Sequence, residues 1–493
     1  DATRSWPESL EAALGGPGAA IAKRWLDAAP VTYRADYEIS EAVADAGIFE
    51  SLETSGPERP AAVRIGRPRA ESDGNGVEKE YRLKTYLREP KTLTELLPIM
   101  QNLGLTVIDQ KPYDLSTADG SDFLLYDFGV TFPAGVDPED IGELYEDALC
   151  AVLSGRAESD SLDRLVLAEK LPWHTVAVLR AYVRYLVQLG TGLSHAFMAD
   201  TLLANPGVTR LVVRLFESSF DPSTGETVEQ RKARRAEITE EIESALNEVP
   251  TLDADKMLRA LAEVVAATVR TNAYQQGPAI AFKLMPQQIT SAPLPRPKYE
   301  IWVYSPRVEG VHLRFGDIAR GGLRWSDRRE DFRTEVLGLV KAQMVKNAVI
   351  IPTGAKGGFF AKQLPDPAAD REAWMTEGRA AYSLFIRSLL DVTDNLVTAE
   401  NGEESVVTPE GVVALDGDDT YLVVAADKGT AAFSDLANSI SQEYGFWLGD
   451  AFASGGSVGY DHKAMGITAR GAWESVKRHF AELGIDCQNE EFT

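Results

Sequence analysis

The stretch from Arg320 to Lys362 constrains this chain most, because it sets positively charged side chains among pairs of glycines on both sides of a predicted helix. Apolar residues recur at helical spacing over 335–347 and predict a helix that faces the core. The next apolar run, Ala348–Ile351, predicts a short buried strand that a Pro-Thr-Gly turn ends. The cations of the stretch include Arg320, Arg324, Lys341, Lys346, Lys356 and Lys362.

We expect Lys356 to lie on a tight loop after that strand, beside Gly357, where the absence of a side chain lets a small ligand reach the backbone. A second glycine pair, Gly321 and Gly322, follows Arg320. Cations gathered around glycines suit a small substrate with two negative charges. The alternative is that each of these side chains simply extends from a solvated surface, as most lysines and arginines do.

The charge balance of the whole chain argues against polyanionic partners. The 493 residues include 50 Lys and Arg against 75 Asp and Glu, which gives a net charge of −25. Such a chain should repel nucleic acid and anionic membrane surfaces. The basic stretch is therefore a local positive cluster in a protein whose net negative charge repels anions. Such a cluster favours a compact anion. The length predicts roughly three domains.

Cysteine and histidine usage points to no metal site and no disulfide framework. Cys150 and Cys487 are the two cysteines, and the five histidines show no ligand spacing. This usage fits a reducing cytosol, and neither a signal peptide nor an apolar run of bilayer length occurs. We expect a cytoplasmic protein. Because the chain begins at Asp1 without methionine and stops at Thr493, we expect it to be a piece of something longer.

The first half of the chain divides by pattern into three parts. Residues 1–75 read as a helical N-terminal segment followed by a Pro- and Gly-rich linker over 55–76. Residues 76–155 alternate as strand, helix, strand, strand and helix, with Asp137 placed to cap the last helix. That order is typical of a ferredoxin-like split βαβ unit, and it resembles the ACT-type modules that bind amino acids or mediate assembly. Residues 156–275 predict helix after helix.

Residues 276–493 predict an α/β domain with a mixed sheet, so the fold class is α/β and α+β multidomain. The run Tyr421–Ala426 is almost wholly apolar, as in a strand buried on both faces, and Asp427 follows its carboxyl end. Ligand clefts in open α/β sheets form outside such ends. We therefore expect Lys356 and Asp427 to face one cleft. The alternative for Asp427 is a helix cap or a turn residue.

A glycine-dense segment, Ala453–Gly471, leads into a predicted helix over 469–480 with Thr468 as its N-cap. A loop that leads into a helix N-terminus can receive an anion or an amide. A plain hinge explains the segment equally well.

The motifs RGGLRW, VKNA, GAKGG and ADKG resemble the substrate-domain motifs of glutamate dehydrogenases. The longer wording RGGLRWSDRREDFRTEVLGLVKAQMVKN, with DKGTAAFSD and FASGGSVGYDHKAMGITARGAWE, is most similar to the large NAD-specific bacterial class. The resemblance is strong over about 299–480 and loose before that. It implies ACT-like modules and a helical segment before the catalytic part, L-glutamate and 2-oxoglutarate as substrates, NAD as cofactor and a homotetramer.

The resemblance also implies roles for individual residues. Lys356 would be the catalytic lysine and Asp427 its proton-transfer partner. Lys346 would bind the substrate α-carboxylate and Arg320 the side-chain carboxylate, a position where the smaller hexameric enzymes have lysine. The remaining substrate-site residues would be Gly321, Gly322 and Gly357, with Thr468 near the cofactor.

No G-x-G-x-x-G motif follows a predicted strand, so the NAD assignment rests on the resemblance. In that class the dinucleotide-binding domain comes after the segment at 469–480, and we expect it to lie outside this chain. Two other functions stay open. One is a non-catalytic amino-acid-binding or assembly module built on the ACT-like fold. The other is a dehydrogenase of an apolar amino acid, against which Arg320 argues because an aliphatic side chain needs no cation.

Overall fold

The computed structural model describes residues 6, 8–9, 18–27, 29–56, 59–66, 80–117, 120, 122–344, 353–457 and 462–491. The chain divides into two compact units, each with its own sheet. The first unit comprises Asp1–Arg184, Leu193–Arg214 and Glu240–Arg259, and the second comprises Tyr185–Gly192, Leu215–Thr239 and Ala260–Thr493.

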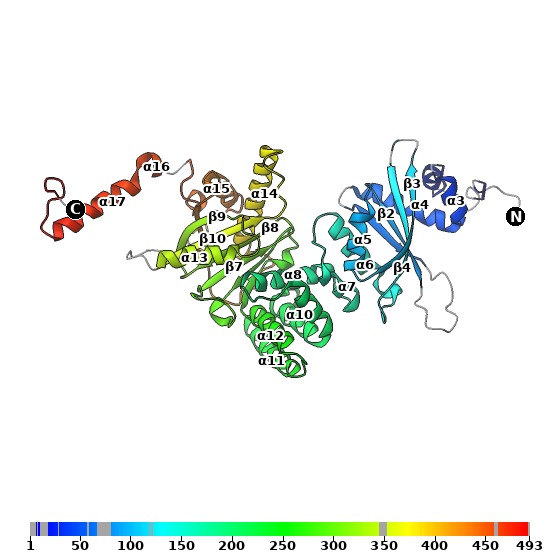
Figure 1. Ribbon diagram of the computed structural model, residues 1–493, viewed down its shortest axis with the longest axis horizontal. Helices are drawn as coiled ribbons and strands as arrows, with labels where there is room; N and C mark the ends of the chain where they lie inside the picture. Colours follow the sequence, from blue (N-terminus) through cyan, green and yellow to red (C-terminus); the bar gives the residue numbers. More distant parts are fainter. Residues whose placement is uncertain are drawn as a thin grey trace. The chain divides into compact units, whose positions relative to one another are not determined.

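The first unit contains a four-stranded antiparallel sheet in the order β1-β2-β4-β3 (Figure 1). Its order matches the antiparallel 4-1-3-2 arrangement of a ferredoxin-like sheet, with β1 in the place of the last strand. The linker expected over 55–76 is wrong at this point, because the short run that forms β1 pairs with β2 along its length. The strands are β1 Ala61–Ile65, β2 Tyr81–Leu87, β3 Thr106–Ser116 and β4 Asp122–Thr131.

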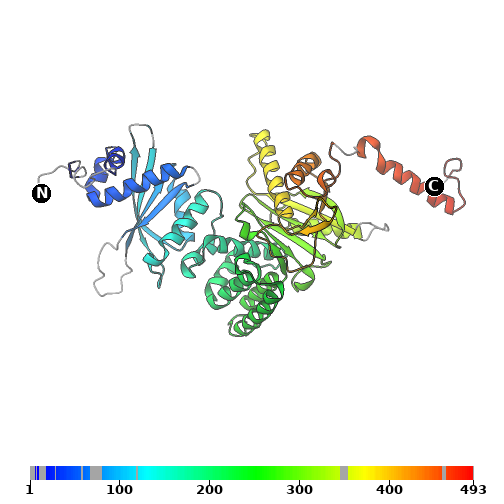
Figure 2. The same cartoon turned by 180° about the vertical axis from the view of Figure 1, so that it is seen from behind.

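Helices cover both faces of this sheet, with α4 on one face and α5 and α6 on the other (Figure 1 and Figure 2). Trp25 and Phe49 from the N-terminal helices pack with Tyr86 and Phe123 of the sheet. The expected cap of α6 is confirmed, because the Asp137 side chain accepts a hydrogen bond from the Glu139 amide at 3.1 Å. The helices are α2 Gly18–Leu26, α3 Val31–Asp36, α4 Ile39–Ser55, α5 Leu93–Asn102 and α6 Pro138–Leu153.

The helical region follows, as its apolar periodicity predicted. Its last helix ends earlier than expected, because Thr268–Thr271 forms strand β5 and pairs with β6. Two threonines and a valine favour this extended backbone once a partner strand is present. The helices are α7 Arg164–Ala168, α8 Trp173–Gln188, α9 His195–Ala204, α10 Pro206–Phe220, α11 Val228–Leu246 and α12 Leu252–Ala266.

The second unit is built on a seven-stranded sheet in the order β13-β9-β10-β8-β7-β6-β5. The expected mixed sheet is confirmed, since β10, β9 and β13 run parallel while the other pairs are antiparallel. Strands β11 Asn395–Thr398 and β12 Glu404–Val407 pair with each other in a separate two-stranded sheet. The sheet strands are β5 Thr268–Thr271, β6 Ile280–Leu284, β7 Tyr299–Tyr304, β8 Val308–Arg314, β9 Ala319–Trp325, β10 Thr353–Ala361 and β13 Val423–Ala426.

Helix α13 packs on one face of this sheet and α14 on the other. Val336 of α13 lies over Gly358, and Phe385 of α14 lies over Gly310, where an added Cβ would collide with the aromatic ring. The end of the helix expected over 335–347 and the strand expected at Ala348–Ile351 lie outside the described residues. The helices are α13 Phe332–Met344, α14 Arg371–Leu390, α15 Ser434–Glu443, α16 His462–Met465 and α17 Ile467–Glu482.

Buried ion pairs hold the segment that leads into β13 against the sheet. Arg270 binds both oxygens of Asp394 at 2.6 and 2.9 Å. Arg314 binds Asp419 at 3.0 Å and the Tyr421 carbonyl at 2.7 Å. A charged side chain can be buried in a core only when a partner of opposite charge is bound to it, as it is here. The network thereby fixes the start of the strand that delivers Asp427.

Among the described residues, no helix is long and apolar enough to cross a membrane.

Candidate active site on the mixed sheet

Lys356 lies inside strand β10 and not on the tight loop expected for it. The register places Lys356 opposite Leu313 of β8, and β9 flanks β10 on the other side. The glycine-rich run around Lys356 could form a central strand because its glycines face side chains that fill the missing volume. Gly358, for example, lies under Val336. The loop prediction was wrong because these packing contacts outweigh the local preference of glycine for turns.

The structure brings Lys356 and Asp427 together. Asp427 follows the carboxyl end of β13, as expected, and its Oδ2 lies 3.0 Å from Lys356 Nζ. Strand β9 separates the two parent strands in the sheet. The residue of β9 over which the lysine reaches is Gly322, whose missing Cβ would lie 3.1 Å from Asp427 Cβ. The two side chains are mostly buried, at 14% and 18% exposure.

Two arginines of β9 share the face of Lys356, because strand residues at even spacing point to the same side. Arg320 is exposed and has no hydrogen bond or ion pair to any described residue. Arg324 instead binds Glu335 Oε1 of α13 at 2.9 Å and Asp427 Oδ1 at 3.4 Å. The same residue type therefore stands in two different electrostatic settings on one strand.

The Asp427 carboxyl group has a pKa below its usual value. Burial acts to raise this pKa, but hydrogen bonds from Lys356 and from the Lys428 amide outweigh burial, and the charges of Lys356 and Arg324 add to them. The carboxylate is thus ionised near neutral pH and can accept a proton. The arrangement provides a lysine amine and a carboxylate in direct contact, beside a cation that is open to a ligand.

The three glycines predicted for the substrate site lie close to other chain segments. A Cβ on Gly321 would overlap the Ala355 carbonyl oxygen at 1.5 Å, so only glycine lets β9 and β10 approach there. Gly322 lies beneath the Lys356–Asp427 contact. Gly357 faces Leu323 and His312 on the opposite side of the sheet from Lys356. Of the three glycines, Gly322 is the one that lies beneath the two proposed catalytic side chains.

The remaining predicted residues are Lys346, Thr468, Lys362 and Lys341. Lys346 lies outside the described residues. Thr468 is the second residue of α17 and is not its N-cap, because the helix begins one residue earlier and Gly466 precedes it. Lys362 pairs with Glu309 at 3.0 Å and is not part of the site, and Lys341 is exposed on α13.

Arg324 was expected only as one of the clustered cations, and no site role was expected for Glu335 or Ser326. The Ser326 hydroxyl donates to Glu335 Oε2 at 2.6 Å, which completes a chain of contacts from α13 to Asp427. Reading residues 319–325 as a strand would have placed Arg324 beside Lys356, because the alternation of Arg320, Gly322 and Arg324 follows a period of two. Nothing in the local sequence marks Glu335, an acidic residue in the first turn of a helix.

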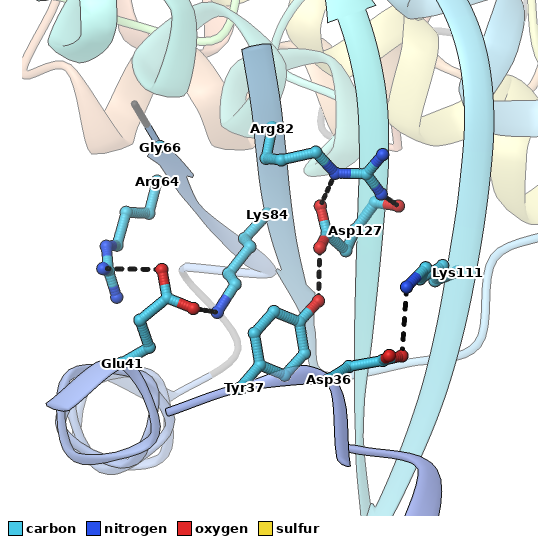
Figure 3. A pocket seen from close by; sticks show the side chains of 9 residues that line it. All are labelled: Asp36, Tyr37, Glu41, Arg64, Gly66, Arg82, Lys84, Lys111 and Asp127. Atoms are coloured by element: carbon cyan, nitrogen blue, oxygen red, sulfur yellow. Dashed lines mark hydrogen bonds and ion pairs between the residues drawn. The ribbon is translucent and has the colours of Figure 1, made fainter. Parts of the chain in front are cut away.

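A pocket lies in the first unit, between its sheet and the N-terminal helices (Figure 3). This pocket has a volume of about 190 Å3, and charged side chains of both signs line it. Asp45, which is fully buried behind it, accepts hydrogen bonds from Lys84 at 2.7 Å and Arg64 at 3.1 Å. The lining residues are Asp36, Tyr37, Glu41, Arg64, Gly66, Arg82, Lys84, Lys111 and Asp127.

Three family models match successive parts of the chain. The model described as the catalytic domain of bacterial NAD-glutamate dehydrogenase matches residues 241–493. The model for helical motif 3 of glutamate dehydrogenase matches residues 157–222. The model for the ACT3 domain of glutamate dehydrogenase matches residues 61–143, which begin at β1.

Curated relatives align with nearly the whole chain. The NAD-specific glutamate dehydrogenase of Halomonas elongata is 48% identical over 99% of this chain and 30% of the relative. The enzyme of that name from Mycobacterium tuberculosis is 46% identical over 100% of this chain and 31% of the relative. The one from Pseudomonas aeruginosa is 48% identical over 94% and 28%. The chain thus spans less than a third of the length of these relatives.

Proposed function

The chain belongs to the bacterial NAD-glutamate dehydrogenase family, and from this we propose that the full-length protein carries out the oxidative deamination of L-glutamate. The reaction converts L-glutamate, NAD+ and water into 2-oxoglutarate, ammonium, NADH and a proton, a step of amino-acid catabolism. The observation that carries the proposal is the 3.0 Å contact between Lys356 Nζ and Asp427 Oδ2 on a sheet face that also presents Arg320. The two members of the pair are 71 residues apart in sequence.

Lys356 and Asp427 are proposed to manage the protons of this reaction. After hydride leaves Cα, water must add to the resulting iminium carbon, and a base must take a proton from that water. Lys356 can act as this base after it passes its own proton to Asp427, which it contacts at 3.0 Å. Asp427, which is ionised, accepts protons from Lys356 through their direct contact and returns one to the nitrogen that leaves as ammonia. As the C–N bond breaks and the C=O bond forms, the hydroxyl of the carbinolamine gives its proton to the Lys356–Asp427 pair, and ammonia takes up a proton to leave as ammonium.

Arg320 is proposed to bind the side-chain carboxylate of the substrate. It is exposed on the Lys356 face, and no described acidic residue neutralises it. A planar guanidinium can hold a carboxylate through two hydrogen bonds, which a lysine at this position cannot do. Lys346, for which we propose the α-carboxylate, would supply the second cation. Two cations for two carboxylates favour glutamate over amino acids with one carboxylate.

The proposed cofactor contact at Thr468 is supported by the family resemblance and not by a sequence motif. Thr468 lies within the first turn of α17, and in the described part of the chain no strand is followed by a loop of G-x-G-x-x-G spacing. We therefore derive no step through the dinucleotide. NAD remains our proposed cofactor because of the family, and parts of the full-length protein beyond these residues would hold most of it.

We further propose that the full-length protein is a cytoplasmic homotetramer, as the family suggests. The mass of the purified protein in solution, measured by light scattering, tests the assembly. A monomeric mass at working concentration contradicts it.

NADH absorbance measured with the purified full-length protein tests the proposed reaction. L-Glutamate should give NAD-dependent turnover, and L-leucine and L-alanine should give little. A preference for an apolar amino acid would instead support the related dehydrogenase. No turnover with any amino acid, from a folded protein, would contradict the proposal.

The pocket of the first unit favours a second candidate function, the binding of a free amino acid. Its lining presents cations such as Lys111 and anions such as Glu41 to the same small volume, and a zwitterion carries both complementary charges. Titration calorimetry of the full-length protein with a panel of amino acids tests this function. A Lys111→Met variant should weaken any such binding, whereas Lys356→Met should not. Absence of heat at millimolar amino acid contradicts it.

A further inference from the structure

Arg324 links two carboxylates that come from different elements. Its Nη1 donates to Glu335 in the first turn of α13, and its Nη2 donates to Asp427 after β13. All three side chains are mostly buried, at 19%, 17% and 18% exposure. Charge-assisted contacts at such sites are stronger and more directional than those on an open surface.

The two oxygens of Asp427 have different partners. Oδ2 faces Lys356 at 3.0 Å, while Oδ1 accepts from the Lys428 amide at 2.7 Å and lies 3.4 Å from Arg324. A carboxylate held on Oδ1 cannot rotate freely, so Oδ2 stays directed at the lysine. The backbone of Asp427 is also fixed, because its amide donates to Thr430 Oγ1 at 3.0 Å.

Glu335 in turn holds Arg324. One of its oxygens accepts from the guanidinium at 2.9 Å and the other accepts from the Ser326 hydroxyl at 2.6 Å. Two protein carboxylates already compensate the charge of this guanidinium, and its Nε is buried without a hydrogen-bond partner among the described residues, so Arg324 is less available than Arg320 to a substrate carboxylate. Arg320, four residues earlier on the same face, has no partner among the described residues. The two arginines are therefore suited to different tasks.

We propose that Arg324 and Glu335 are positioning residues, which form a clamp that keeps the Asp427 carboxylate directed at Lys356, while Arg320 is left to bind substrate. This inference rests on the proposed glutamate dehydrogenase reaction and assigns these residues a part in it. Arg324 acts through Asp427 and does not contact the reacting atoms. Glu335 acts through Arg324 and ties the clamp to α13.

The test compares Arg324→Gln, Arg324→Lys and Glu335→Gln in the full-length enzyme. Arg324→Gln should lower kcat by about 10- to 100-fold, because a small misplacement of a catalytic group has an effect of that order. The KM for glutamate should change less than about threefold, since no substrate contact is lost. Arg324→Lys should restore part of kcat, because a single ammonium reaches one carboxylate at a time. Glu335→Gln should lower kcat less than Arg324→Gln does.

The pH profile separates positioning from a purely structural role. The charged groups that face Asp427 in the described structure are Lys356 of β10 and Arg324 of β9, with Glu335 behind Arg324. Removing the Arg324 charge should raise the pKa of Asp427, so the acid limb of the kcat profile should move to higher pH. Arg328→Gln is the matched control, because Arg328 pairs with Asp331 on the surface and should leave kcat and the limb unchanged.

Each other outcome overturns the clamp. If KM rises tenfold or more while kcat is retained, Arg324 is a substrate ligand. If kcat and the acid limb of Arg324→Gln match the wild type, Asp427 needs no clamp, and if only Glu335→Gln matches it, Glu335 has no part. Circular dichroism and thermal melting identify variants that fail to fold, and Arg324→Lys then serves as the test. A wild-type enzyme without glutamate turnover contradicts the proposed function itself and is distinguished from these results.

Discussion

Lys356 and Asp427 belong to strands that are not neighbours, and they meet above Gly322 of the strand between them, with 3.0 Å from Nζ to Oδ2. Two strand spacings amount to about 10 Å, which the long lysine stem can bridge only where the intervening residue leaves room. The pair therefore depends on a glycine as much as on its own two members.

Gly322→Ala should impair the site. The added Cβ would lie 2.8 Å from the Ala426 carbonyl oxygen and 3.1 Å from Asp427 Cβ, so the end of β13 must shift. A shift of about 1 Å predicts a loss of kcat on the order of 100-fold. Gly338→Ala is the control, since a Cβ there meets nothing within 4 Å and alanine favours the helix. Wild-type kcat in Gly322→Ala would show that the contact tolerates displacement.

Lys356→Met and Asp427→Asn should each remove most turnover and leave the fold intact. Methionine keeps the apolar stem of the lysine, and asparagine keeps the shape of the aspartate, so each change removes mainly the proton chemistry. General acid–base groups contribute about 100- to 10,000-fold, and we expect kcat losses in that range. Steady-state kinetics with glutamate measures them, with circular dichroism as the check on folding. A kcat near the wild-type value in either variant would remove that residue from the proposed mechanism.

Arg320→Ala should change substrate preference and not stability. The side chain is exposed and has no described partner, so its removal should alter unfolding by less than about 0.5 kcal/mol. Losing one charged hydrogen-bonding group should cost about 1.5–3 kcal/mol of glutamate binding, which is roughly a 10- to 100-fold rise in KM. Amino acids with one carboxylate should be affected far less. Lys341→Ala, another exposed cation, is the control, and an unchanged KM for glutamate in Arg320→Ala would contradict its role.

His312 should make the second unit sensitive to acid. It is fully buried, neither ring nitrogen has a hydrogen-bond partner in the described structure, and burial together with the Arg314 charge lowers its pKa from 6.5 to about 3, against an opposing effect of Asp419. The ring is neutral in the folded protein. When the pH falls far enough for the unfolded chain to bind a proton at this histidine, the unfolded state is stabilised and the free energy of unfolding decreases. Stability should therefore fall as pH drops from about 6.5 toward 3, with a slope of up to about 1.4 kcal/mol per pH unit.

Urea unfolding of wild type and His312→Leu between pH 7 and 4, in roughly unit steps, measures this slope. The variant should lose stability less steeply, because the proton uptake of one histidine is gone. His479→Leu, which changes a histidine near the end of the exposed helix α17, should keep the wild-type slope. Equal slopes in wild type and His312→Leu would show that the buried ring does not govern acid sensitivity.

Local patterns predicted the regular elements well where apolar residues are frequent. The helices expected over 156–275 form as far as Ala266, and Asp137 caps α6 as its position before Pro138 suggested. The local patterns failed at β9 and β10, whose sequences ARGGLRW and TGAKGGFFA contain more glycine and charge than a buried strand usually has. Those segments are extended because partner strands and packed helices occupy the space that side chains would fill.

The sequence by itself determined which chemistry was available: a lysine, an aspartate after an apolar strand, arginines beside paired glycines, and the motifs that place the chain in its family. Only the tertiary structure decided which of these groups meet. Arg320 and Arg324 are the same residue type on the same strand face, yet Glu335 and Asp427 reach only the second. Glu335 is 11 residues from Arg324 in sequence and Asp427 is 103, and both contacts form only when helix α13 and strand β13 have packed with β9.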